Sequence, residues 1–277
     1  MLAHRRVAAS AAALSLLALA GCATPEPPST GTEHAAPSAH VHEIVVDPSG
    51  DGFLLGTHDG LFAASVDGEI GGRIGQHAFD AMGLTVVGDD LLASGHPGPN
   101  SPAEWGSPHL GIIRSSDGAR SWSPVTFTGE KDFHVLAPGV DGAVFGISTD
   151  SSRLLVSTDV GQTWAEAGAS VPALDLAVDA TGRLIAATPQ GLQVSLDDGA
   201  SFTAWASSPS MYALSSSPDQ QRVVGIDARE RIWVTTAGAD AWEQAGRAHG
   251  GVQAVTITDD GDIVVVDDSG LTVLNAT

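Results

Sequence analysis

Cysteine, lysine and tyrosine are each used only once in this chain of 277 residues, and each scarcity excludes something. The only cysteine is Cys22, so no intrachain disulfide can form and the fold depends on its packed core. Lys131 and eleven arginines oppose 33 acidic residues, for a formal charge of −21. Such a charge repels nucleic acid and anionic lipid headgroups, so we expect no nucleic-acid partner. The only tyrosine is Tyr212, so any tyrosine nucleophile would have to be this residue.

Long hydrophobic runs are also scarce, and the one that exists lies at the N-terminus. A basic head that includes Arg5 and Arg6 precedes the uncharged stretch 7–20, which is typical of a secretory leader and short for a membrane span. The sequence Leu-Ala-Gly-Cys at 19–22 matches the cleavage site of bacterial lipoproteins. We therefore predict removal of residues 1–21, lipidation of Cys22 and location on the outer face of the bacterial cytoplasmic membrane. Cleavage takes the formal charge from −21 to −23, because the leader holds two arginines and no acid.

The segment 22–39 is rich in proline, serine, threonine and alanine and has no hydrophobic period. Such a composition cannot bury enough surface to order itself, so we expect a flexible tether that follows the lipidated cysteine. The folded domain is expected over 40–277.

A hairpin motif occurs three times, at 115–122, 157–164 and 195–202. Each copy begins with Ser-x-Asp, has a glycine within the next two residues and has an aromatic residue five positions after the Asp. The aspartate can accept backbone N–H bonds across a turn, and glycine permits positive φ. The motif therefore predicts tight β-hairpins.

Around these hairpins a unit of about 40 residues repeats six times, the length of a four-stranded propeller blade. Each unit opens with an apolar strand; the six lie at 42–48, 82–88, 133–139, 173–179, 211–218 and 252–258. The sequence thus predicts an all-β protein, a β-propeller of six blades of four antiparallel strands. The last unit ends after its third strand, so its outer strand is either missing or supplied by residues near 33–39, which would close the ring.

Because strands alternate direction within a blade, the start of the first strand and the end of the second share one face of the disc. The first-strand positions that ring the channel mouth on this face are predicted to be His42, Met82, His134, Leu174, Tyr212 and Gln253. The second-strand ends on the same face are His58, His96, Asp227 and Asp267. By strand alternation, Glu43 is expected to point away from the mouth. The insertion at 96–109 leaves from this face and could cover the mouth, with Trp105 as a contact residue.

Four histidines and a methionine therefore gather in three consecutive blades, as His42, His58, Met82, His96 and His134. Imidazole with a nearby thioether suits copper, and imidazole alone suits zinc. The alternatives are general bases in a binding cleft, or water-bonded polar residues of a wet channel.

The whole mature chain resembles Asp-box, or BNR, repeat lipoproteins of bacteria, which are described as sialidase-like or as glycosyl hydrolases. The resemblance is carried by HVHEIVVDP, GTHDGLF, MGLTVVG, SGHPGP and DFHVL. It implies a propeller that hydrolyses a sugar linkage, with Tyr212 as nucleophile and with Asp227, Arg229 and Arg231 as further catalytic candidates. The Arg-Ile-Pro signature of sialidases is absent; the nearest string is Arg-Ile-Trp at 231–233.

Three functions remain open at this point. The favoured one is a monomeric, non-catalytic surface protein that binds a metal, a glycan or a protein at the channel mouth. The second is a sialidase-like glycoside hydrolase, and the third is a scaffolding or assembly propeller without a small ligand. Fold alone does not decide among them.

Overall fold

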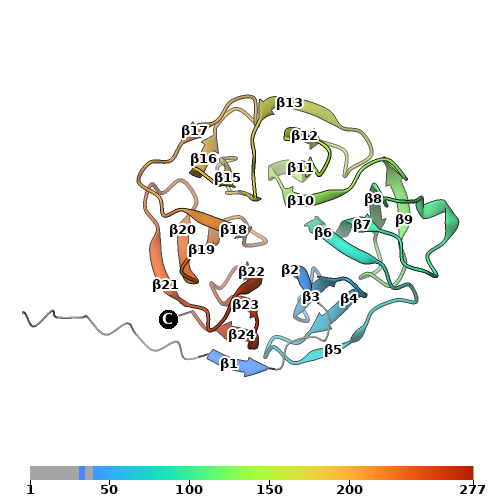
Figure 1. Ribbon diagram of the computed structural model, residues 1–277. Coiled ribbons are helices and arrows are strands. Elements are labelled where there is room, and N and C mark those ends of the chain that lie inside the picture. The colour runs from blue at the N-terminus through green and yellow to red at the C-terminus, as the bar shows by residue number, and fades with distance from the viewer. Residues whose placement is uncertain (1–30, 35–39, 277) are drawn as a thin grey trace, which may run out of the picture.

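The computed structural model describes residues 31–34 and 40–276, so the predicted leader and Cys22 lie outside the described residues. Six sheets of four antiparallel strands form a ring around a central channel (Figure 1). The predicted six-bladed, all-β propeller is confirmed. No helix in the described ranges is long and apolar enough to cross a membrane.

The blades are numbered here in chain order, each from its innermost strand outward. Blades 1 to 3 are formed by β2 (Val41–Val46), β3 (Phe53–Thr57), β4 (Gly60–Ala64) and β5 (Ile70–Arg73); by β6 (Asp80–Val87), β7 (Asp90–His96), β8 (Ile112–Ser115) and β9 (Ser123–Thr126); and by β10 (Phe133–Pro138), β11 (Val144–Ser148), β12 (Arg153–Ser157) and β13 (Ala165–Ser170). Blades 4 and 5 are formed by β14 (Asp175–Val178), β15 (Leu184–Thr188), β16 (Gly191–Ser195) and β17 (Thr203–Ala204); and by β18 (Met211–Ser216), β19 (Arg222–Asp227), β20 (Arg231–Thr236) and β21 (Glu243–Arg247). Blade 6 contains β22 (Val252–Ile257), β23 (Ile263–Asp267) and β24 (Gly270–Leu274). Short 3-10 helices lie at Ala103–Trp105 and Val140–Gly142.

The ring is closed by the N-terminal part of the chain. Strand β1 (Gly31–His34) pairs antiparallel with β24 and completes blade 6 (Figure 1). The outer strand of the last blade is therefore not missing but supplied by the N-terminal segment. It begins at residue 31, two residues before the range 33–39 that the sequence suggested. Four residues of the segment expected to be a tether therefore belong to the propeller.

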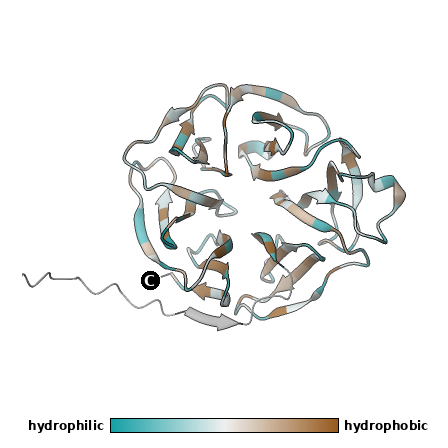
Figure 2. Cartoon of the chain, in the orientation of Figure 1, coloured by the Kyte–Doolittle hydropathy of each residue, from teal (hydrophilic) through white to brown (hydrophobic). Residues whose placement is uncertain are grey.

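Apolar side chains fill the seams between neighbouring blades, and hydrophobic residues concentrate on the strands (Figure 2). One cluster joins Leu54 of blade 1 to Leu84 and Leu91 of blade 2. Another joins Ile44 of blade 1 to Val264 of blade 6, across the point of ring closure. Each blade thus buries its faces against its neighbours, and the residues at the strand ends are held on a rigid ring.

The three Ser-x-Asp hairpins share one hydrogen-bond pattern. In the second copy, Ser157 Oγ donates to Asp159 Oδ1 at 2.9 Å and accepts from Gly161 N at 2.9 Å. The first copy has Ala119 where the second has Gly161, yet both residues take a left-handed conformation, with φ of 65° and 79°. The side chain of Ala119 is fully buried among the residues of blades 1 and 2.

β-Bulges occur in the innermost strands of five blades, near the channel mouth. The residue that falls outside the regular register is His42 in β2, Met82 in β6, His134 in β10, Tyr212 in β18 and Gln253 in β22. These are five of the six positions that the sequence pattern predicted for the mouth. Because a bulge re-aims side chains locally, these residues are turned out of the regular alternation of the strand.

The insertion after β7 packs beside the outer strand β9 and is anchored in the core by Trp105. Trp105 is 2% exposed and meets Phe79 edge to face, with ring centroids 5.6 Å apart. The contact role considered for Trp105 was therefore wrong, because the apolar seam between blades 1 and 2 buries its ring.

Candidate metal centres

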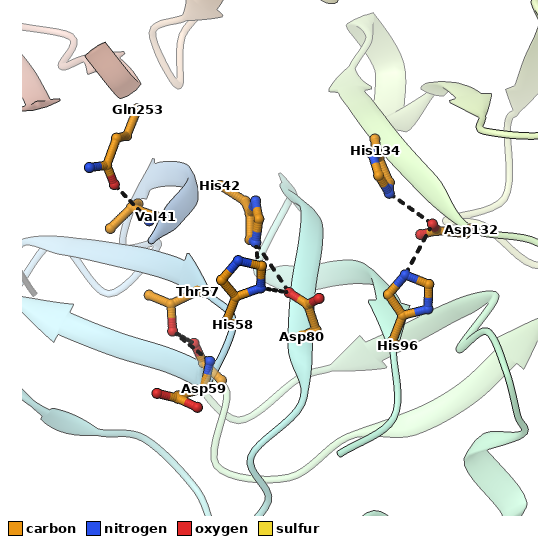
Figure 3. A network of polar contacts seen from close by, with 11 residues as sticks. Val41, His42, Thr57, His58, Asp59, Asp80, His96, Asp132, His134 and Gln253 are labelled. Atoms are coloured by element: carbon orange, nitrogen blue, oxygen red, sulfur yellow. Dashed lines mark hydrogen bonds and ion pairs between the residues drawn. The ribbon is translucent and has the colours of Figure 1, made fainter. Parts of the chain in front are cut away.

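The first His–Asp group consists of His42, His58 and Asp80 and joins blade 1 to blade 2 (Figure 3). His42 Nε2 and His58 Nδ1 lie 3.2 Å and 2.9 Å from the same carboxylate oxygen, Asp80 Oδ1. The two ring nitrogens are 3.2 Å from each other. Three ligand-type atoms thus form a small, nearly equilateral triangle.

The second His–Asp group consists of His96, Asp132 and His134 and joins blade 2 to blade 3 (Figure 3). His134 Nε2 and His96 Nε2 approach the same oxygen, Asp132 Oδ2, at 2.8 Å and 3.4 Å. The carboxylate of Asp132 is buried, with 4% of the side chain exposed. Its other oxygen, Oδ1, has no hydrogen-bond partner among the described residues.

The two groups share two of their three blade positions, and their third histidine comes from a different place in the ring. In each, one histidine ends or directly follows the second strand of a blade (His58 after β3, His96 at the end of β7), and the carboxylate comes from the next blade. That carboxylate, Asp80 or Asp132, lies two residues before the bulge position of its own blade. By this register Met82 in the second group corresponds to His42 in the first. Met82 is half-buried at its bulge, and its role as a ligand stays a prediction.

The hydrogen bond of His96 to the backbone fixes the protonation of its ring. His96 Nδ1 lies 3.1 Å from the carbonyl oxygen of Pro108, and a carbonyl can only accept, so Nδ1 carries the proton. In the neutral ring Nε2 then presents a lone pair toward Asp132. Histidines that bind metals are commonly held in this way by a backbone carbonyl at the other nitrogen.

The electrostatic setting differs between the groups. Burial lowers the pKa of His42 to about 4; the charge of Asp80 opposes this shift, and His58 and His40 add to it. The pKa of His134 is raised, chiefly by its hydrogen bond to Asp132, against the effect of burial. The charge of Asp80 also contributes to the raised pKa of His134, so the two groups influence each other electrostatically.

The spacing of the atoms fits a transition-metal ion. With ligand bonds of about 2.0–2.1 Å, neighbouring ligands of a tetrahedral zinc lie about 3.3 Å apart. The separations in the first group are 2.9–3.2 Å, and the two measured to Asp132 are 2.8 and 3.4 Å. Two imidazoles and a carboxylate leave a fourth position free for water or a further ligand.

Two more histidines lie beside the groups. The ring centroid of His40 is 5.0 Å from that of His42 and 5.9 Å from that of His58. The ring centroid of His109 is 5.3 Å from that of His96, and its buried Nδ1 has no hydrogen-bond partner in residues 31–34 and 40–276.

Sequence reasoning did not select either aspartate, although a signal was present. Asp80 and Asp132 stand two residues before the mouth position of their blades, and His40 stands at the same place in blade 1. Comparing that position among the blades would have shown a metal-ligating side chain in three successive units.

The residues considered for hydrolysis lie in blade 5. Asp227 accepts hydrogen bonds from Arg231 Nε at 2.7 Å and from Trp233 Nε1 at 3.0 Å, so its carboxylate is engaged within its own blade. Tyr212 donates to Glu230 Oε2 at 2.8 Å, a partner that the sequence reading did not identify. Burial, followed by the effects of Glu230, raises the pKa of Tyr212, which opposes its ionisation as a nucleophile. Arg229 contributes its backbone N–H to Asp227 at 2.8 Å.

No protein-family model matches the chain, and a search of curated proteins finds no match. Solved structures do resemble it. YCF48 bound to a D1 peptide is 14% identical with a TM-score of 0.60, and the match covers 91% of this chain and 96% of that one. The β-propeller domain of Cps50 (Swd1) from Myceliophteria thermophila is 10% identical with a TM-score of 0.55, over 89% and 100% of the two chains.

An ancestral GH74 enzyme is 14% identical with a TM-score of 0.50. The match covers 90% of this chain but only 38% of the enzyme. At such identities the likeness establishes the propeller fold, which these proteins of different function share.

Proposed function

We propose that this protein is a non-catalytic, surface-anchored binding protein that holds transition-metal ions, zinc or copper, in its two His–Asp groups. The observation that carries the proposal is the convergence of two imidazoles on one carboxylate oxygen, which occurs twice in successive blades. Each carboxylate comes from a different blade from at least one of its histidines, so a bound ion would also bridge the blades. The leader and Cys22 support a location on the outer face of the bacterial cytoplasmic membrane.

Both groups offer borderline ligands, imidazole nitrogen and carboxylate oxygen, and contain no thiolate. This set suits Zn²⁺ and Cu²⁺, and two histidines with one carboxylate also suit Fe²⁺. In the first group His42 is neutral at pH 7, because its pKa is near 4, and its Nε2 is available as a ligand. In the second group, the hydrogen bond from His96 Nδ1 to the carbonyl oxygen of Pro108 leaves His96 Nε2 available as a ligand.

The hydrolase alternative receives less support from this geometry. A tyrosine nucleophile needs help to ionise, whereas burial and Glu230 hold Tyr212 in its protonated form. Asp227 and Arg231 are paired with each other at 2.7 Å and do not face an open site as free groups. The likeness to the GH74 enzyme extends to the fold and no further.

Titration of the mature chain with Zn²⁺ and with Cu²⁺ tests the proposal. The protein used is residues 23–277, which retains β1 and lacks the lipid-bearing cysteine. We expect two equivalents to bind. Asp80→Asn should abolish one of them and Asp132→Asn the other, each weakening its site by on the order of 100-fold or more, since even outer-shell changes cost 10–100-fold.

Asparagine has nearly the shape of aspartate, so the two variants keep the local packing. His77→Ala is the matched control, because His77 lies outside both groups and bonds to the carbonyl oxygen of Asn100. Unchanged binding in the Asp80→Asn, Asp132→Asn double variant would contradict the proposal.

A further inference from the structure

A cavity of about 470 Å³ occupies the central channel. The innermost strands of all six blades line it, from Glu43 of β2 to Thr256 of β22. It extends toward the hairpins that join the first and second strands, as its lining by Asp47, Asp89 and Asp259 shows. These hairpins lie on the face opposite the His–Asp groups. The volume is in the range of pockets that enclose small organic ligands.

The charged residues that line this cavity are all acidic. Five carboxyl groups line it, and no lysine, arginine or histidine is among its lining residues; the five are Glu43, Asp47, Asp89, Asp175 and Asp259. Burial raises the pKa of Glu43, and the charge of Asp175 adds to this shift, because no cation in the lining balances these groups. An ammonium group that entered between them would favour their ionised forms. Because the walls of the cavity are of low dielectric, the field of these groups is concentrated inside it.

Two of these carboxyl groups come from opposite sides of the ring. Glu43 belongs to blade 1 and Asp175 to blade 4, three blades away. Alternation predicted that Glu43 points away from the channel mouth; the bulge at His42 shifts the register, and Glu43 lines the cavity. The carboxyl group of Glu43 accepts one hydrogen bond, from its neighbour Ile44 N at 3.3 Å.

Asp175 is held in place by the backbone. Its two oxygens accept from Leu176 N at 2.8 Å and from Leu214 N at 2.7 Å, and these residues belong to neighbouring blades. The carboxyl group is therefore fixed in orientation. Burial raises its pKa to about 7, which is the behaviour of a desolvated acid without a counter-charge.

Part of the remaining wall is apolar, because the half-buried Val45, Val46 and Val86 line it, whereas the leucines that border it are almost fully buried between the blades. Serine and threonine residues complete the lining. Carboxyl groups combined with an apolar wall fit a cation that carries a hydrocarbon body. A bare metal ion fits less well, because the described residues bring three or more ligand atoms together only in the two His–Asp groups. We propose that the channel cavity binds a small organic amine, with an ammonium group between Glu43 and Asp175 and its hydrocarbon part against the valines.

Isothermal titration with a matched pair of probes tests this site. Hexane-1,6-diamine and hexane-1,6-diol have the same chain length and differ in charge. We expect residues 23–277 to bind the diamine and to give no measurable binding of the diol. Glu43→Gln and Asp175→Asn should each weaken diamine binding at least tenfold.

Two controls separate this site from other effects. Glu104→Gln removes an exposed acid outside the cavity, so it reports attraction to the overall negative charge and should leave binding unchanged. Asp132→Asn impairs a His–Asp group and should also leave diamine binding unchanged, which keeps this site independent of the metal proposal. Melting curves confirm that each variant is folded; if Asp175→Asn is not, Glu43→Gln decides, because it alters a side chain with one local hydrogen bond.

The proposal is overturned if the diamine does not bind at millimolar concentration. It is also overturned if the diol binds equally well, or if diamine binding survives Glu43→Gln unchanged.

Discussion

The carboxyl group of Asp175 should make the stability of the propeller depend on pH in an unusual direction. Its pKa in the folded chain is about 7, raised by burial from an ordinary value of 3.8. Between these values the folded protein holds a proton that the unfolded chain has released. The free energy of unfolding therefore falls as the pH rises through this window, and the stabilising proton is lost above pH 7.

Asp175→Asn removes this titration with little change of shape. Each pH unit within the window is worth about 1.4 kcal/mol, so wild type should lose roughly 2–3 kcal/mol between pH 5 and pH 7.5 through this group. Asp175 Oδ1 accepts from Leu176 N and Oδ2 accepts from Leu214 N, so asparagine keeps one of these bonds and sets an NH2 group, which cannot accept, against the other N–H. The variant should therefore be less stable than wild type at pH 5 by about 1–3 kcal/mol, and this deficit should shrink as the pH rises to 7.5.

His42 titrates in the opposite sense and must be separated from Asp175. Its pKa is lowered from 6.5 to about 4, so between these values the unfolded chain binds the proton and stability rises with pH. The two effects oppose each other below pH 6.5 in wild type. Subtracting the wild-type profile from that of Asp175→Asn cancels the contribution of His42.

Urea unfolding of both proteins with a chelator, at half-unit steps from pH 5 to 8, measures this difference. The stability of the variant relative to wild type should rise by roughly 2–3 kcal/mol across the range. Parallel profiles for the two proteins would show instead that Asp175 keeps an ordinary pKa in the folded chain.

Three further changes test the packing, each by its free energy of unfolding. Gly199→Ala should cost about 2–5 kcal/mol, because Gly199 has a φ of 84° and an added Cβ would overlap the side chain of Leu154. Asp179→Ala should cost about 3–5 kcal/mol, since it leaves the guanidinium of Arg183, 8% exposed and 2.8 Å from Asp179, without its partner; a loss below 1 kcal/mol would contradict this. Trp105→Ala should cost about 3–5 kcal/mol, because it empties a buried position, and should leave the number of bound metal ions unchanged. Loss of a bound ion in this variant would show that Trp105 contributes to a metal site.

Much of the fold follows from patterns that the sequence shows directly. Strand alternation and the 40-residue repeat predict six blades, and the Ser-x-Asp motif marks hairpins whose bonds recur in all three copies. The predicted mouth positions His42 and His134 are both bulge residues. Aligning the repeats found them because the bulge falls at the same place in each of these blades.

The remaining features depend on departures from that alternation. His42 lies in a bulge, and the next residue, Glu43, lines the channel cavity. Strict strand alternation assumes no extra residue, so it could not predict this position of Glu43. Asp80 and Asp132 precede the mouth positions by two residues, and each has at least one histidine partner in the preceding blade, so this pairing depends on how the blades meet. Burial of Trp105 could not be predicted because the insertion has no hydrophobic period.

The most direct test of the central claim is an anomalous-difference map from crystals of residues 23–277 soaked in zinc, collected above the zinc absorption edge. We expect two peaks, one within about 2.0–2.2 Å of His42 Nε2, His58 Nδ1 and an oxygen of Asp80, and one equally placed among His96, Asp132 and His134. Peaks only at surface carboxylates, or no peak at either His–Asp group, would contradict it.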